Sequence, residues 1–224
     1  MTTKKMQKII SLLEKEYGIP RFDGYHNPLD ELILTILSQN TSWQNCSRAF
    51  DSLKRSFKDW KQVASADTGK IAQAIKTGGL SRIKAERIKN ILKVIYEERG
   101  SYCLEFLKKD KLKEAHKFLI SLKGVGPKTA ACVLLFSCRK PILPVDTHIL
   151  RISKRLELIP KDTDLAKAHE LLGRLVPDDK ENILTFHVDM IEHGRMICKS
   201  RKTRCRNCIF KLLCPYGHSQ KLSK

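Results

Sequence analysis

The chain turns between two segments of helical periodicity at Leu122-Lys123-Gly124-Val125-Gly126-Pro127-Lys128-Thr129. Glycine favours tight turns and close backbone approach, and proline suits the first turn of a helix. The unpaired N–H groups of such a helix start favour an anion. We therefore predict that Gly124, Val125 and Gly126 bind a nucleic-acid phosphate through their backbone. An ordinary joint between two helices would explain the glycines about as well.

The same stretch is not a Walker A loop. That loop has a glycine directly before its lysine and four residues between its glycines, whereas Pro127 precedes Lys128 here. Binding of a nucleoside triphosphate at this turn is therefore excluded.

Helical periodicity extends over most of the chain. Apolar residues recur with a period of about 3.6 residues, and no segment alternates with period two for long enough to form a strand. The sequence predicts an all-α fold with a polar, frayed tail from Tyr216 to Lys224. Helices are expected at about 4–17, 28–37, 44–57, 67–76, 81–99, 111–122, 127–138, 146–156, 163–175 and 178–194.

The chain is strongly basic. It has 224 residues, with 43 Lys and Arg against 24 Asp and Glu, and a net charge of +19. Positive charge on a folded chain favours a polyanion, because bound phosphates release their counterions, although it can also serve solubility alone. The composition excludes a fibre or a disordered tail. No run approaches the roughly 18 apolar residues of a membrane span and no export signal is evident, so we expect a cytoplasmic protein.

The eight cysteines fall into two groups. Four are scattered and are interpreted as inert core thiols: Cys46, Cys103, Cys132 and Cys138. The others form the pattern C-x6-C-x2-C-x5-C and predict a metal centre: Cys198, Cys205, Cys208 and Cys214. Structural zinc sites usually contain two C-x2-C or similar pairs that are separated by a longer stretch. Here one C-x2-C is flanked by single cysteines, which favours a [4Fe-4S] cluster over zinc.

Cations lie between these cysteines. We predict that Lys199, Arg201 and Lys202 contact a phosphate backbone from a loop that the metal centre holds stiff. The alternative is a solvated run of charge.

Three features together resemble one family: the stretch LKGVGPKTA, the stretch PVDTHILR, and the four-cysteine pattern. They are similar to the helix-hairpin-helix DNA glycosylase superfamily, and most of all to its endonuclease III branch. The resemblance implies two helical domains flanking a DNA-binding cleft, with a C-terminal [4Fe-4S] loop. Residues 22–135 would form a six-helix barrel that carries the hairpin, and residues 1–21 and 136–224 a helical iron–sulfur domain.

The resemblance also implies the catalytic pair. Lys128 takes the position of the family's amine nucleophile and Asp146 that of its acidic partner. A carboxylate stabilises the positive charge that develops on the sugar, and an amine at C1′ gives a Schiff base that permits β-elimination. By residue type alone Lys128 is one cation among 43 Lys and Arg. Asp146 could also be a helix N-cap, which is compatible with catalysis.

Base extrusion requires side chains that fill the vacated stack. By resemblance, Asn40 and Leu80 are the candidates, with Gln39 as a further DNA contact. Where the endonuclease III branch commonly has Ala-Gln-Ala-Thr-Asp, this chain has Gln39-Asn40-Thr41-Ser42-Trp43, so the acidic residue is missing. Asn40 is also similar to the asparagine of 8-oxoguanine glycosylases. Gln39 and Asn40 could instead form a helix C-cap, and His148, His187 and His193 are interpreted as structural.

The sequence therefore predicts a bifunctional DNA glycosylase and AP lyase that removes oxidised pyrimidines from double-stranded DNA and cleaves abasic sites by β-elimination. We expect a monomer, associated with a prokaryotic nucleoid. Two alternatives remain: a glycosylase of the same superfamily for 8-oxoguanine or a mismatched base, and a non-enzymatic DNA-binding module.

Overall fold

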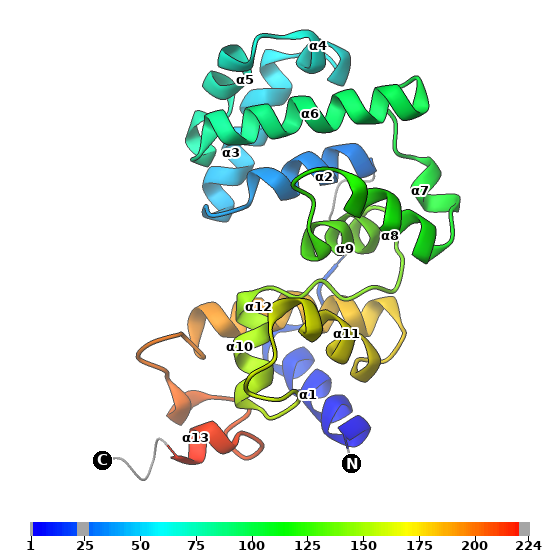
Figure 1. Cartoon of the computed structure of the whole chain (residues 1–224). Helices are drawn as coiled ribbons and strands as arrows, with labels where there is room; N and C mark the ends of the chain where they lie inside the picture. Colours follow the sequence, from blue (N-terminus) through cyan, green and yellow to red (C-terminus); the bar gives the residue numbers. More distant parts are fainter. Residues whose placement is uncertain (1, 22–26, 220–224) are drawn as a thin grey trace. The chain divides into compact units, whose positions relative to one another are not determined.

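The computed structural model describes residues 2–21 and 27–219, and every regular element in these ranges is helical (Figure 1). The chain folds into two compact units, Gly24–Lys140 and the pair of segments Met1–Asp23 and Pro141–Lys224. None of the described helices is both long and apolar enough to cross a membrane. The all-α prediction is confirmed.

The unit Gly24–Lys140 is built around helix α2, which buries nearly all of its residues. The side chain of Asn27 caps this helix by accepting hydrogen bonds from Leu29 N at 2.9 Å and Asp30 N at 3.2 Å. Helix α2 packs against α3, α6 and α9. The unit contains α2 (Pro28–Leu37), α3 (Trp43–Ser56), α4 (Trp60–Ser65), α5 (Thr68–Ala74), η1 (Lys76–Gly78), α6 (Ser81–Arg99), α7 (Phe106–Lys109), α8 (Leu112–Ser121) and α9 (Pro127–Phe136).

The second unit is centred on α12, which packs against α1 and α10. Its buried face includes the polar residues His187, Asp189 and His193 as well as apolar ones. The unit contains α1 (Thr2–Tyr17), α10 (Thr147–Arg155), α11 (Leu165–Leu175), α12 (Lys180–Met196), η2 (Cys205–Asn207) and α13 (Pro215–Ser219).

The helices expected from periodicity are all present, with ends that differ by a few residues. The short helices α4 and α7 were not predicted, because six and four residues are too few to establish a period. The predicted frayed tail is wrong for Tyr216–Ser219, which lie in α13. His218 Nε2 lies 2.8 Å from Lys211 O, and the Arg155 guanidinium lies 4.2 Å from the Tyr216 ring centroid. These contacts hold the segment in place, and residues 220–224 lie outside the described part of the chain.

Candidate active site and metal centre

The glycine turn joins α8 to α9. Gly124 has φ +89°, a conformation that residues with a side chain rarely adopt. Val125 N donates to Leu122 O at 2.9 Å, and the Val125 side chain is buried, so both the N–H and the side chain of this residue are used within the turn. Gly126 is the N-cap of α9 and has no side chain with which to cap this helix start. The turn therefore has the exposed glycines and uncapped helix start that an anion requires.

Lys128 is the second residue of α9 and is half-buried. It follows Pro127 directly, within the first turn of the helix, where the helix dipole disfavours an ammonium group. The next residue, Thr129, is buried. The lysine side chain thus starts from a rigid helical position beside the glycine turn.

The structure excludes one alternative for the segment after α2, the helix C-cap. Ser38 is the C-cap of α2, so neither Gln39 nor Asn40 has that role. The Gln39 amide binds within the protein: Oε1 accepts from Arg87 Nη1 at 2.5 Å, and Nε2 donates to Thr129 Oγ1 at 3.4 Å. Asn40 is exposed and has φ +54°. The Gln39 side chain thus binds within the protein, whereas Asn40 is exposed.

Leu80 has features in common with Asn40. Its φ is +50°, and its side chain is 52% exposed. A residue other than glycine in the left-handed region costs about 1–3 kcal/mol and is often found at functional sites. Trp43, where the family commonly has an acid, is 60% exposed and is therefore not part of the core.

Asp146 lies in the other unit, as the N-cap of α10. Its Oδ1 accepts a hydrogen bond from Ile149 N at 2.8 Å, and the residue is half-buried. The hydrogen bond fixes one carboxylate oxygen against the helix. The carboxylate is thus both a helix cap and a negative charge at a defined position.

The four C-terminal cysteines line one small cavity, and all four are free thiols. Burial, and then the neighbouring thiols Cys198, Cys214 and Cys205, raise the pKa of Cys208 to about 12. Four thiolates so close together require a compensating positive charge. In the described residues, no three His, Cys, Asp or Glu side chains are grouped as a site for a metal ion. The remaining residues that line the cavity are Ile197, Lys211, Tyr216 and Gly217.

Two arginines from α10 hold the loop that begins at Cys198. Arg151 donates to Cys198 O from Nε at 3.1 Å and from Nη2 at 2.8 Å. Arg155 Nη1 donates to Cys198 Sγ at 3.2 Å and to Lys199 O at 2.7 Å. Sequence reasoning did not single out these arginines, because nothing in a basic chain marks the cations that bind backbone.

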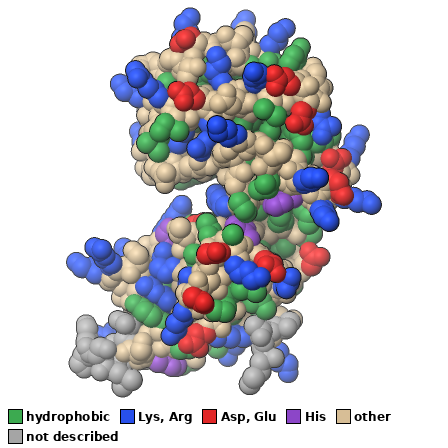
Figure 2. All heavy atoms as spheres, in the orientation of Figure 1, with side chains coloured by type: hydrophobic (Ala, Val, Ile, Leu, Met, Phe, Trp, Pro, Cys, Tyr) green, Lys and Arg blue, Asp and Glu red, His purple; other side chains and the backbone are tan. Residues whose placement is uncertain are grey.

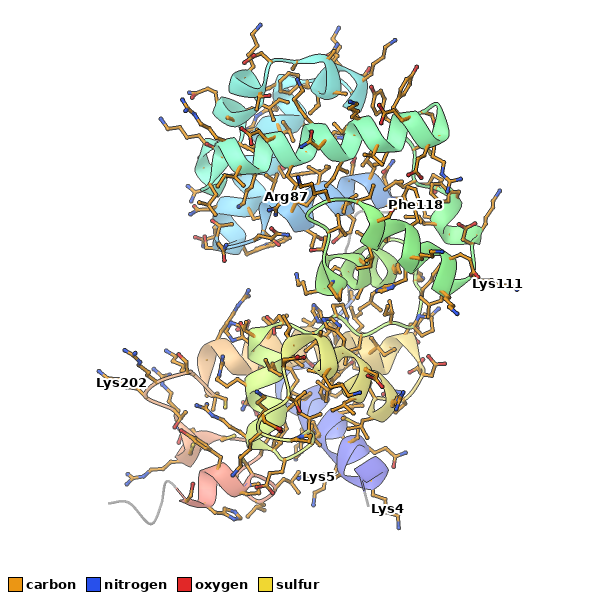
Figure 3. All side chains as sticks on the ribbon, viewed as in Figure 1. Lys4, Lys5, Arg87, Lys111, Phe118 and Lys202 are labelled. Atoms are coloured by element: carbon orange, nitrogen blue, oxygen red, sulfur yellow. The ribbon has the colours of Figure 1, made fainter. Side chains whose placement is uncertain are left out.

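The cations of this loop are exposed. Lys199, Arg201 and Lys202 all lie at the surface, and Lys202 points away from the ribbon (Figure 3). Lys and Arg side chains are also spread over the visible surface of both units (Figure 2). The backbone of this loop is thus held by Arg151 and Arg155, and its cationic side chains are available to a polyanion.

The three histidines have structural contacts. His187 Nδ1 lies 2.8 Å from Pro144 O, and His148 Nδ1 lies 3.1 Å from Arg151 Nη2. His193 is buried, with Nδ1 2.8 Å from Tyr17 OH and Nε2 3.4 Å from Cys208 Sγ. Burial lowers the pKa of His193 to about 4, so this imidazole is neutral near pH 7.

Comparison with known proteins identifies the family. Residues 33–178 match the model of the HhH-GPD superfamily of base excision DNA repair proteins. The chain belongs to this superfamily. It is 35% identical over 201 residues to endonuclease III of Thermotoga maritima, covering 88% of this chain and 89% of the relative. It is 41% identical over 182 residues to an Arabidopsis thaliana protein named as a DNA glycosylase, covering 80% of this chain but only 58% of that protein.

Solved structures agree in fold. A non-covalent endonuclease III–DNA complex matches with a TM-score of 0.83 at 24% identity, covering 100% of both chains. A thermostable thymine-DNA glycosylase matches with a TM-score of 0.82 at 24% identity, covering 97% of this chain and 99% of the other. The chain is thus an endonuclease III-like DNA glycosylase, of a family in which AP lyase activity is typical. The alternative of a non-enzymatic binding module is wrong.

Proposed function

We propose that this HhH-GPD protein removes oxidised pyrimidines from duplex DNA and cleaves the resulting abasic site, with Lys128 as the nucleophile and Asp146 as its acidic partner. The observation that carries the proposal is the place of Lys128, in the first turn of a helix that begins at an uncapped glycine turn. The two compact units of the chain would be the family's barrel and iron–sulfur domains.

The Asp146 carboxylate would act first. Cleavage of the N-glycosidic bond leaves positive charge on the sugar, and a fixed carboxylate lowers the energy of that transition state. The hydrogen bond from Ile149 N holds Asp146 at the start of α10, so its charge need not be reoriented during the reaction. The departing base takes the electron pair of the broken bond.

The Lys128 amine then forms the covalent bond. Neutral Nζ forms a bond to C1′, and the bond between C1′ and the ring oxygen O4′ then breaks as an amine proton passes to O4′, which leaves a Schiff base between C1′ and Nζ. The Schiff base acidifies the C2′ proton, and removal of that proton expels the 3′ phosphate by β-elimination. A free lysine has a pKa of about 10.4 and is mostly protonated near pH 7, whereas the attack requires the neutral amine.

Other residues would hold the DNA. The backbone of Gly124 and Gly126 would bind a phosphate at the start of α9, whereas the predicted contact of Val125 is not proposed again, because its N–H donates to Leu122 O. Asn40 and Leu80 would fill the vacated stack, and their exposed, left-handed conformations support this assignment. The cations Lys199, Arg201 and Lys202 would contact the backbone elsewhere.

The cysteine cavity suits an iron–sulfur cluster. Cys198, Cys205, Cys208 and Cys214 would each supply one thiolate to a [4Fe-4S] cluster. The cluster would contribute structure, by holding the basic loop against Arg151 and Arg155.

Metal analysis tests the cofactor. The purified protein should be yellow-brown, with absorption near about 400 nm. Cys205→Ala should lose this band and iron, and should unfold at a lower temperature. A colourless protein that contains zinc would contradict the cofactor assignment.

Trapping with borohydride tests the chemistry. Native protein mixed with duplex DNA that contains an abasic site should form a covalent adduct, and Lys128→Ala should form none. Lys123→Ala, which removes an exposed cation five residues earlier, is the matched control and should still trap. Equal trapping by the native protein and Lys128→Ala would refute the nucleophile.

A second specificity within the superfamily has its own support. The chain lacks the acid that the endonuclease III branch commonly has at Trp43, and its fold matches a thymine-DNA glycosylase as well as endonuclease III. Excision from duplexes containing thymine glycol, 8-oxoguanine or a G·T mismatch would separate the candidates. Preferred excision of thymine glycol would support the proposed substrate, and preference for either other duplex would replace it.

A further inference from the structure

Arg87 on α6 contacts two segments that are far apart in sequence. Its Nη1 donates to Gln39 Oε1 at 2.5 Å. Its Cδ lies 2.6 Å from where a Cβ on Gly124 would be, so the arginine side chain packs directly against the glycine turn. Figure 3 shows Arg87 on the side of α6 toward α2 and this turn. The guanidinium therefore links the segment after α2 to the turn before α9.

Gln39 extends the link to the residue beside Lys128. While Oε1 accepts from Arg87, Nε2 donates to Thr129 Oγ1 at 3.4 Å. Thr129 is buried and directly follows Lys128 in α9. We call Arg87, Gln39 and Thr129 the Arg87 network. All three belong to the unit Gly24–Lys140.

The charge of Arg87 has no acidic partner. Arg87 is half-buried, and no carboxylate in the described residues forms an ion pair with it. By contrast, the neighbouring Lys84 is buried and donates to Leu37 O at 2.7 Å and Gly78 O at 2.8 Å, as expected of a cation that only joins backbone segments.

We propose that Arg87 is a positioning residue, which acts through Gln39 and Thr129 to hold the first turn of α9, and with it Lys128, against the phosphate-binding turn. This inference rests on the proposed function of Lys128. An arginine fork is suited to this role, because its planar donors fix direction as well as distance. A small displacement of a nucleophile from its attack geometry reduces the rate strongly, while DNA affinity, which is spread over many phosphates, changes little.

Single-turnover trapping tests the network. Schiff-base formation would be measured at saturating enzyme on abasic-site DNA, and Kd on a tetrahydrofuran analogue that forms no Schiff base. We expect Arg87→Ala and Gln39→Ala each to slow trapping about 10-fold or more, with Kd changed less than about 3-fold. Arg87→Lys should not restore the rate, because a lysine keeps the charge but loses the fork.

The double variant supplies a readout that general destabilisation would not give. If the residues act as one unit, Arg87→Ala with Gln39→Ala should be no slower than the slower single variant. Lys93→Ala on the same helix, with its side chain 72% exposed, is the control for loss of one positive charge and should trap like native protein.

Three results would overturn the proposal. Weaker DNA binding at an unchanged trapping rate would make Arg87 a direct phosphate ligand. Additive losses of trapping rate in the double variant would show that Arg87 and Gln39 act independently. Native trapping rates in all the variants would show that Arg87 does not position Lys128. Failure of the native protein to trap would instead contradict the proposed function, so the two failures are distinguishable.

Discussion

Helices α9 and α10 begin in opposite ways. The start of α9 follows a glycine turn, and its N-cap residue, Gly126, has no side chain with which to close it. The start of α10 is closed by its own carboxylate, because Asp146 Oδ1 accepts from Ile149 N at 2.8 Å. In α10 the backbone donors of the helix start orient a carboxylate, and in α9 we propose that the corresponding donors bind a phosphate.

The comparison shows that the start of a helix can have two chemical uses, to bind an anion or to orient a carboxylate. Gly126 has no side chain to compete with a bound anion at α9. Asp146 uses one oxygen for the helix and leaves the other available to a developing cation, which would be a catalytic use of a helix cap. Each of the following predictions tests this contrast.

The largest effect should come from replacing the cap of α10. Asp146→Asn should slow base excision by about 100-fold to 1,000-fold, because a neutral amide does not stabilise a cationic sugar. Its free energy of unfolding should stay within about 0.5 kcal/mol of native, since Asn and Asp are comparable N-caps, whereas Asp146→Ala should lose about 1 kcal/mol. Single-turnover excision and urea unfolding would measure the two roles, and a native rate in Asp146→Asn would remove the catalytic one.

A smaller effect, on the free energy of unfolding, should distinguish Gly124 from Gly126. Gly124→Ala should lower the free energy of unfolding by about 1–3 kcal/mol, because φ is +89° and the added Cβ would collide with Arg87. Gly126→Ala has φ −94° and open space around the new methyl, so stability should change by less than about 0.5 kcal/mol.

DNA affinity distinguishes their roles further. The Gly126 methyl should weaken binding to an abasic-site duplex, because it would lie between the helix start and a phosphate. Urea unfolding and fluorescence anisotropy measure the two quantities. Equal losses of stability in both variants would show that Gly124 and Gly126 have the same structural role, which would contradict the prediction.

A second carboxyl group of the same unit sharpens the comparison with Asp146. Asp189 on α12 is buried, and its Oδ2 has no hydrogen-bond partner in the described residues. Burial, and then Glu14 and Glu192, raise its pKa to about 7. Asp189 Oδ2 thus lacks, among the described residues, a donor such as the one that Asp146 Oδ1 has.

The pH dependence of stability follows from that raised pKa. In the unfolded chain Asp189 ionises near pH 3.9, so its contribution to stability is complete below about pH 4 and is lost as pH rises toward 7. Asp189→Asn should be more stable than native protein at pH 8, by on the order of 1–2 kcal/mol, and the difference should shrink toward pH 4. Urea unfolding at pH 5 and 8 measures this, and a constant difference would contradict the assignment.

Much of the fold could be predicted because its signals are local. The apolar period located the long helices, and Asn27 with Pro28 marked the start of α2. Short helices were missed because α4 and α7 contain too few residues to show a period. Tyr216–Ser219 were misjudged as frayed, because a polar composition does not reveal contacts such as that of Tyr216 with Arg155.

The sequence by itself determined the chemistry that is available. Residue type and order gave the glycine turn with Lys128, the capping position of Asp146, the four clustered cysteines and the family resemblance that the comparisons confirm. The tertiary structure alone decided which side chains have protein partners. It placed Gln39 between Arg87 and Thr129, left Asn40 and Leu80 exposed, and set Arg151 and Arg155 under the cysteine loop. The physical reason is that hydrogen bonds between residues distant in sequence depend on how helices pack, and no local pattern encodes that packing.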